Sequence, residues 1–316
     1  MDNHNNPLVV LVGPTAVGKT ALSIALAKAF DAEIISGDSM QVYRGMDIGT
    51  AKITPEEMQG VPHHLLDILD PDEPFNALMF KQRAEAAMAD IRRRGRLPMV
   101  VGGTGLYVNG LIYDYAFQGA RDEEYRTSIY EEMTADPQKA QAYYQALIAS
   151  RPDLEGVIFP GDYFRISRAL EVMKMDGKDV VKNFNMPKNY QSPYKLCLIG
   201  LTMDRALLYE RINQRVDVML ENGLVEEVEK LLDKGYNKEM QALKAIGYKE
   251  IIAMCEGRLS RTEAVALLKK NTRHFAKRQL TWFRRDPNIR WFEVDKLDEA
   301  ALSAAVKTYI TTCLSD

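Results

Sequence analysis

Residues 8–20 read LVVLVGPTAVGKT, an apolar run followed by the pattern G-x-x-x-x-G-K-[ST]. The run predicts a buried strand, and the pattern predicts a phosphate-binding loop at the start of a helix. Glycines let successive backbone N–H groups surround phosphate oxygens, and the positive end of the helix faces the same anion. Lys19 adds a positive charge, and the Thr20 hydroxyl can ligate Mg²⁺. We therefore expect a diphosphate or polyphosphate to bind at Gly13, Pro14, Thr15, Ala16, Val17, Gly18, Lys19 and Thr20.

Composition places the chain among ordinary globular enzymes. It has 316 residues, of which 46% are hydrophobic and 27% charged. The net charge of −3 gives no global attraction to nucleic acid, so any such binding would come from local patches. No run approaches the roughly 20 apolar residues of a membrane span, and the first residues do not resemble a signal peptide. We expect a cytoplasmic protein with no membrane partner.

Strand and helix patterns alternate through the first third of the chain. Helices are predicted at 19–30 and about 77–94, with strands at 32–36 and 97–101. Strand character returns only at 195–201 and 289–294, after a stretch that is helical in pattern. We predict an α/β protein with a P-loop NTPase-like core, its central parallel sheet flanked by helices. The core would comprise residues 1–117 and 194–316, with an inserted all-helical domain at 118–193.

Three further features are candidates for the site, each with an ordinary structural alternative. Asp38 follows the second strand and could be a general base, a group near Mg²⁺, or only a cap for the next turn. Thr104 follows two glycines after the third strand and could be a turn residue. Arg211 and Arg215 share a face of a predicted helix, where a solvated basic stripe is the simpler interpretation.

Seven stretches, in the same order along the chain, resemble the tRNA dimethylallyltransferases, also called tRNA isopentenyltransferases. They are GPTAVGKT (13–20), GDSMQVYRGMDIGTAK (37–52), PHHLLDILDP (62–71), VVGGTGLY (100–107), FRISRALEV (164–172), LKAIGYKE (243–250) and AKRQLTWFRR (276–285). This family transfers the dimethylallyl group of dimethylallyl diphosphate to N6 of adenosine 37, in the anticodon loop of tRNAs that read codons beginning with U. The products are N6-(dimethylallyl)adenosine and diphosphate.

The resemblance implies a role for each candidate. Asp38 would be the general base, Arg215 would contact the diphosphate, and Thr104 would lie near the reactive amine. Mg²⁺ would be the cofactor, held at Thr20. An exocyclic adenine amine is a poor nucleophile, because its lone pair is delocalised into the ring, so a carboxylate that takes its proton makes chemical sense. The departing diphosphate gathers negative charge, which the loop N–H groups and cations would stabilise.

A local basic region supports an RNA partner. Residues 261–290 are rich in Lys and Arg with interleaved aromatics, a pattern that ordinary amphipathic packing also produces. The resemblance implies that tRNA is the partner and that the helical insert takes part in binding it. One large sheet with a closed site and tRNA as partner does not require a dimer, so we expect a monomer. The implied tRNA contacts are Asp38, Ser39, Met40, Gln41, Thr104, Arg126, Phe164, Arg165, Ile166, Ser167, Arg168, Lys244, Gly247, Tyr248, Lys249, Lys277, Arg278, Gln279, Trp282 and Arg284.

Two other classes of function fit part of the pattern. A small-molecule or nucleoside kinase would use the same loop for ATP, but it usually carries an acidic residue near a strand end for Mg²⁺. Here the third strand ends in Val101-Gly102-Gly103-Thr104, without an acid. An RNA-binding module without catalysis would leave Asp38 and the phosphate loop without a role.

Overall fold

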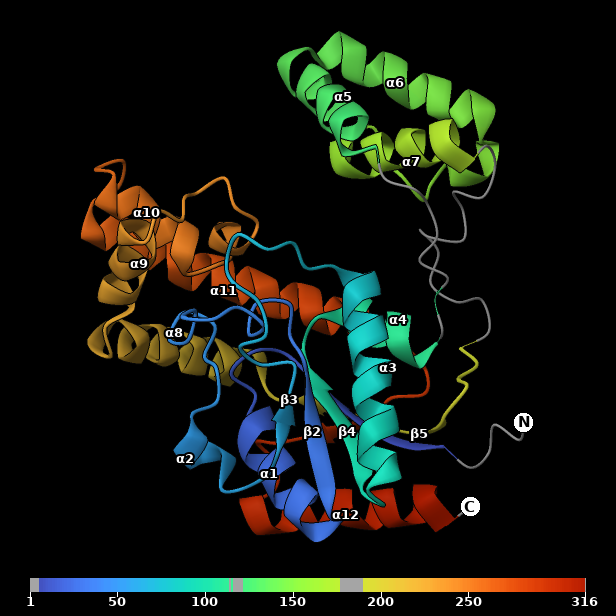
Figure 1. The fold of residues 1–316 in the computed structure, drawn as a ribbon, viewed down its shortest axis with the longest axis vertical. Helices are drawn as coiled ribbons and strands as arrows, with labels where there is room; N and C mark the ends of the chain where they lie inside the picture. The colour runs from blue at the N-terminus through green and yellow to red at the C-terminus, as the bar shows by residue number, and fades with distance from the viewer. Residues whose placement is uncertain (1–5, 114, 116–121, 177–189, 316) are drawn as a thin grey trace. The chain divides into compact units, whose positions relative to one another are not determined.

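The computed structural model describes residues 6–113, 115, 122–176 and 190–315. The chain divides into two compact units, a core formed by residues 1–112 and 192–316 and a second unit of residues 113–191 (Figure 1). The sequence predicted the insert at 118–193. The predicted boundary at 117–118 lies outside the described residues, whereas the structural division falls slightly before it.

The core is built on one parallel sheet of six strands in the order β3-β2-β4-β1-β5-β6. The predicted α/β class with a central parallel sheet is confirmed. The strands are β1 (Pro7–Val12), β2 (Ala32–Gly37), β3 (His63–His64), β4 (Leu97–Gly102), β5 (Lys195–Thr202) and β6 (Arg290–Glu293). The edge strand β3 was not predicted, because two residues are too short to show a periodic pattern.

Helices cover both faces of the sheet because the inner strands are apolar on both sides. In β1, Val9 and Leu11 join the cluster formed with α1 and α12, while Leu8 and Val10 are buried on the opposite side. The helix α3 packs against β2 and β4 and contacts α4 (Figure 1). These helices are α1 (Lys19–Ala29), α3 (Ala77–Arg93), α4 (Gly105–Ile112) and α12 (Glu299–Ser315).

The remaining core helices come mainly from the last third of the chain. They are α2 (Pro55–Met58), α8 (Arg205–Glu221), α9 (Leu224–Asp233), the short η4 (Ala242–Lys244), α10 (Tyr248–Cys255) and α11 (Arg261–Phe283). The longest, α11, begins with a capping box in which Ser260 and Glu263 satisfy each other's backbone N–H groups. It packs against α8, α10 and α4, so it spans from the C-terminal helices to the loop that follows β4 (Figure 1).

The second unit is helical in its described residues. It contains α5 (Glu123–Ala135), α6 (Pro137–Ser150), η2 (Pro152–Leu154) and α7 (Tyr163–Asp176). The three α-helices pack on one another around their own apolar core, which includes Met133, Leu147 and Ile166. A separate core is what allows this unit to be compact by itself.

Candidate active site

The phosphate loop joins β1 to α1. Gly18 adopts a left-handed conformation (φ +99°) directly before the first residue of α1, as the glycine in this motif predicts. The Lys19 ammonium turns back and donates to the carbonyl oxygens of Gly13 and Pro14, at 2.9 and 2.8 Å. Burial and the nearby Arg215 lower the pKa of Lys19 to about 7, against a smaller raising effect of Asp38. Two carbonyl groups of the loop thus hold the Lys19 side chain inside the loop, where a bound anion would contact it.

Arg215 of α8 reaches this loop from a position 200 residues away. Its Nη1 donates to the Thr15 hydroxyl at 3.3 Å. Burial lowers the pKa of Arg215 from its usual value. The structure therefore brings Arg215 to the phosphate loop, and Arg211, one turn earlier on α8, is exposed.

Asp38 lies immediately beyond the end of β2. Its Oδ1 accepts the backbone N–H groups of Met40 (2.8 Å) and Gln41 (3.4 Å), so the carboxyl group does cap the following turn. In the described part of the chain no donor reaches Oδ2. Burial raises the pKa of Asp38, which the two N–H groups and the charge of Lys19 only partly offset. The capping and general-base interpretations are therefore compatible, because each uses a different oxygen.

Thr104 is joined to the Asp38 turn. Its hydroxyl oxygen accepts the Ser39 N–H at 3.2 Å, and its own N–H donates to the Gly37 carbonyl at 3.3 Å. This approach requires glycine, because a Cβ on Gly102 would overlap the backbone of Gly37. The carboxyl ends of β1, β2 and β4, which are neighbours in the sheet, thus carry the phosphate loop, Asp38 and Thr104 respectively.

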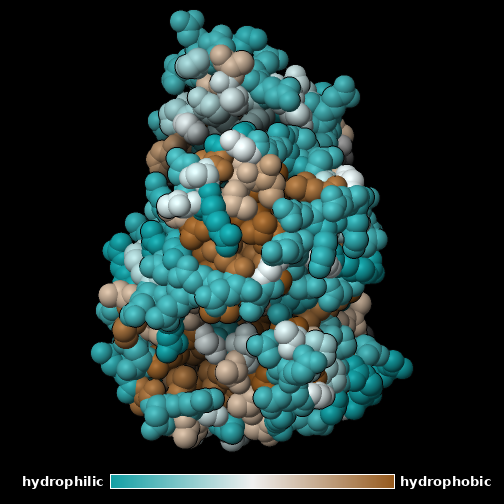
Figure 2. Space-filling model, turned by 90° about the vertical axis from the view of Figure 1, so that its left-hand side faces the viewer, coloured by the Kyte–Doolittle hydropathy of each residue, from teal (hydrophilic) through white to brown (hydrophobic). Residues whose placement is uncertain are grey.

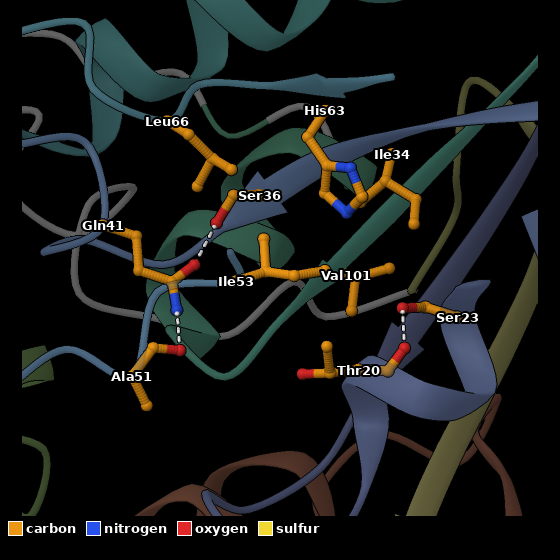
Figure 3. A pocket seen from close by; sticks show the side chains of 10 residues that line it. All are labelled: Thr20, Ser23, Ile34, Ser36, Gln41, Ala51, Ile53, His63, Leu66 and Val101. Atoms are coloured by element: carbon orange, nitrogen blue, oxygen red, sulfur yellow. Dashed lines mark hydrogen bonds between the residues drawn. The ribbon is translucent and has the colours of Figure 1, made fainter. Parts of the chain in front are cut away.

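A small cavity of about 50 Å³ separates the start of α1 from the loop that follows β2 (Figure 3). The Gln41 side chain forms part of its wall, accepting the Ser36 hydroxyl at 3.0 Å and donating to the Thr50 and Ala51 carbonyls. The Thr20 hydroxyl makes no hydrogen bond within the described residues and lies at this cavity. Hydroxyl oxygen is a ligand that Mg²⁺ accepts, with phosphate oxygens and water completing its shell, so the residues present fit this ion.

Glu227 in the first turn of α9 is a residue of this site that sequence reasoning missed. Its carboxylate accepts the backbone N–H groups of Asp47 (3.0 Å), Ile48 (2.7 Å) and Gly49 (3.1 Å). The Tyr248 hydroxyl also donates to it, at 2.6 Å. These bonds hold the second half of the loop that begins at Asp38. No sequence signal marks Glu227, because it lies in an amphipathic helix where other glutamates are simply solvated.

The α11 residues assigned to tRNA divide between an outer and an inner face. Lys277, Arg278 and Arg284 are exposed. Gln279 is buried, and Trp282 packs against Gly105, where a Cβ would meet the indole ring. The outer face therefore presents the basic residues, and the inner face contacts the loop that carries Thr104.

The stretch from η4 to the start of α10 is divided in a similar way. Lys244 and Lys249 are exposed, whereas Tyr248 is completely buried and bonded to Glu227. Gly247 has φ +102°, and its N–H donates to the buried Glu250 at 2.8 Å.

Between α10 and the start of α11 lies a hollow of about 410 Å³ with mainly apolar walls. Figure 2 shows hydrophobic surface in hollows between hydrophilic rims on the side of the core that carries α8 to α10.

In the helical unit, the assigned residues lie in the first turns of α7, apart from Arg126, which lies on α5. Phe164 is 63% exposed, and Arg165 is exposed beside Asp162. Arg126 and Arg168 both lie near the buried carboxylate of Glu171. Ile166 and Ser167 have no exposed surface, so they support the unit's core rather than present a side chain to a partner.

Comparison with known proteins identifies the family. The model of the IPP transferase family matches residues 41–286, and that of the isopentenyl transferases matches residues 6–74. The tRNA dimethylallyltransferase of Bacillus subtilis is 49% identical over 295 residues, which is 93% of each chain. This chain belongs to the tRNA dimethylallyltransferase family. It is accordingly a prenyltransferase by family, as its sequence predicted.

Other members of the tRNA dimethylallyltransferase family also match this chain over most of its length. That of Halalkalibacterium halodurans is 50% identical over 292 residues, 92% of each chain. The crystal structure of a tRNA isopentenylpyrophosphate transferase from Bacillus halodurans has a TM-score of 0.75 and 46% identity, covering 98% of this chain and 97% of that one. A eukaryotic dimethylallyltransferase, described as acting on tRNA, has a TM-score of 0.78 at 28% identity, covering 95% and 77%. Among the described residues, no helix is both long and apolar enough to cross a membrane.

Proposed function

We propose that this protein transfers the dimethylallyl group of dimethylallyl diphosphate to N6 of adenosine 37 in tRNA, releasing diphosphate. The observation that carries the proposal is that the phosphate loop after β1 and the Asp38 carboxyl group after β2 lie at the same edge of the sheet. Thr104, which follows the intervening strand β4, is bonded to the turn of Asp38. Membership of the tRNA dimethylallyltransferase family supports the substrates. We further propose that the protein acts as a monomer in the cytoplasm.

Asp38 would accept the proton of the attacking amine. Burial raises the pKa of its carboxyl group, so its carboxylate is a stronger base than an exposed one. Oδ1 is held by the Met40 and Gln41 N–H groups, which fix the orientation of the carboxyl group and leave Oδ2 to the substrate. As the C–N bond forms at the allylic carbon, the C–O bond to the diphosphate breaks, and the N6 proton passes to Asp38.

The phosphate loop would receive the negative charge that develops on the leaving diphosphate. Arg215, and Lys19 once it is protonated, would supply positive charge at the loop, and bonds to Gly13, Pro14 and Thr15 set their positions before the substrate arrives. Such preorganisation stabilises the transition state, in which the diphosphate carries more negative charge, more than it stabilises the bound substrate. Thr20 would hold Mg²⁺ together with phosphate oxygens, and the ion would supply further positive charge to stabilise the leaving group.

The exposed basic residues of α11, with Lys244 and Lys249, would bind the tRNA backbone. A base that is stacked in the anticodon loop cannot present N6 to a pocket, so adenosine 37 has to leave the stack. Backbone contacts supply affinity, whereas recognition of the base itself requires contacts to its edge. Thr104 would make such a contact, and the position of its hydroxyl at the turn of Asp38 supports this role.

The decisive experiment incubates the protein and Mg²⁺ with unmodified tRNA and either labelled dimethylallyl diphosphate or γ-labelled ATP. We expect label on adenosine 37 from the prenyl donor and none from ATP. A tRNA with guanosine at position 37 is the matched control and should stay unlabelled. ATP-dependent phosphorylation without prenyl transfer would overturn the proposal in favour of a kinase.

A further inference from the structure

The side chain of Gln279 joins two loops of the site. It is 6% exposed in α11, and both ends of its amide group are bonded. Oε1 accepts the backbone N–H of Thr15 in the phosphate loop at 2.9 Å, and Nε2 donates to the carbonyl of Gly103 at 3.0 Å. The loop after β1 and the loop after β4 are thus connected through a residue 264 positions from Thr15.

Gln279 packs closely against the loop after β4. A Cβ on Gly103 would overlap the amide nitrogen of Gln279, so a larger residue there would have to displace the end of this side chain. Trp282, on the same side of α11, packs on Gly105 in a similar way. Two successive contacts therefore seat α11 on the segment that contains Thr104, while Lys277 and Arg278 point outward.

We infer that Gln279 is a positioning residue for the phosphate loop, and that it couples the occupancy of the outer face of α11 to diphosphate binding. The resemblance to the family implies instead that Gln279 contacts tRNA, but both of its polar groups are already bonded inside the core. Coupling of this kind is reciprocal, so RNA on α11 and diphosphate in the loop would each raise the affinity for the other. The assignment of RNA as the ligand of α11 rests on the proposed function.

The test compares Gln279→Leu with the outward-facing control Arg278→Leu. Inorganic pyrophosphate with Mg²⁺, titrated calorimetrically, measures the loop, and a labelled anticodon stem-loop measures the RNA face. We expect Gln279→Leu to weaken pyrophosphate binding about tenfold, because the Thr15 N–H and the Gly103 carbonyl lose their buried partner. Its affinity for RNA alone should stay within about twofold of wild type, and Arg278→Leu should show the opposite pattern.

A second variant perturbs the same contact without changing Gln279. Gly103→Ala pushes the flexible end of the Gln279 side chain away, so it should weaken pyrophosphate binding to a similar extent. The double variant should then lose no more than the larger single loss, since both act on one contact. Thermal melts establish that each variant is folded. Additive losses, or a Gln279→Leu protein that binds pyrophosphate normally and RNA poorly, would overturn the inference.

Coupling is measured by repeating the RNA titration with saturating pyrophosphate. Wild type should bind the stem-loop more tightly in its presence, and Gln279→Leu should lose this response; an equal response in both proteins contradicts the coupling. None of these measurements requires prenyl transfer. If no prenylated tRNA forms but pyrophosphate binding responds to Gln279, the proposed function fails while the positioning role stands.

Discussion

The two ends of β2 carry carboxyl groups whose pKa values shift in opposite directions. Glu33, at the start of the strand, has no exposed surface and is bonded to Arg94, Arg96 and His64. Its pKa falls to about 2, chiefly through the hydrogen bond from Arg94. Asp38, just past the other end, has two backbone N–H donors and only the nearby charge of Lys19, so burial raises its pKa.

This difference separates a structural carboxylate from the one that we propose as a general base. Glu33 is compensated by several charged partners and sits at the end of the sheet away from the phosphate loop. Asp38 is incompletely compensated at the end where parallel sheets bind ligands. Groups whose pKa is perturbed toward the working pH cluster at functional sites, which supports the role proposed for Asp38.

The largest expected effect is the loss of turnover on changing Asp38. Asp38→Asn keeps an acceptor for the Met40 and Gln41 N–H groups but cannot take a proton, so kcat should fall about 10²-fold or more. The affinity for tRNA should change little, and thermal stability should not fall, because a costly buried charge is removed. Single-turnover prenylation and a thermal melt measure the two quantities.

Glu33→Gln is the matched control, and it should lower stability while leaving turnover unchanged. Turnover of the folded protein should stay near wild type, while the free energy of unfolding falls by about 1–3 kcal/mol because charged hydrogen bonds are lost. The folded pKa of Glu33 is depressed, so its contribution to stability is present above pH 4.5 and disappears as the pH falls toward 2. Equal turnover losses in the two variants would remove the distinction between the ends of β2.

The second effect concerns the loop that carries Asp38. Glu227→Gln places an amide N–H against the N–H groups of the 47–49 backbone, which should displace the loop and lower kcat about tenfold. Glu226→Gln, in the same helical turn but exposed, should leave kcat unchanged. The pH profile of kcat is the discriminating measurement, because a displaced loop alters the apparent pKa of Asp38. An unchanged profile would mean that Glu227 only stabilises the fold.

A smaller effect is expected at a surface cation that has no part in either carboxylate's environment. Lys277→Ala should weaken the binding of all tRNAs alike and reduce the slope of log affinity against log salt by about one. Turnover at saturating tRNA should not change. Filter binding at several salt concentrations tests this, and a change in preference among tRNAs with the same slope would indicate base reading instead.

The smallest expected effect is the uptake of a fraction of a proton by Lys19 when diphosphate binds. With a pKa of about 7, Lys19 is half neutral at pH 7 in the free protein, and a bound diphosphate should return it to the charged form. Binding should therefore take up about half a proton at pH 7 and more at pH 8. Calorimetry in HEPES and in Tris measures the uptake, and Lys19→Arg, which is always charged, should lack it. Equal uptake in both proteins would assign the proton to another group.

The strand before the phosphate-loop pattern, the parallel sheet and the positions of Asp38 and Thr104 at neighbouring strand ends were predictable, because they depend on local patterns and on strand ends that meet at one edge. The roles of Asp38 and Thr104 are implied by the family resemblance. Arg215 was ambiguous by spacing and was singled out by the family resemblance. The contacts of Gln279 inside the core, and those of Glu227, could not be predicted, because their partners lie 264 and about 180 residues away and both residues lie in ordinary amphipathic helices.

The sequence by itself predicted an anion-binding loop, since the order of glycines, lysine and threonine between a strand and a helix is typical of backbone geometry that surrounds phosphate oxygens. Only the tertiary structure decided how that chemistry is held in place. Burial converts Asp38 into a stronger base, and helices from the last third of the chain supply the amide and carboxylate groups that fix both loops. Those effects depend on dielectric environment and on contacts across the fold, neither of which is encoded in any local stretch.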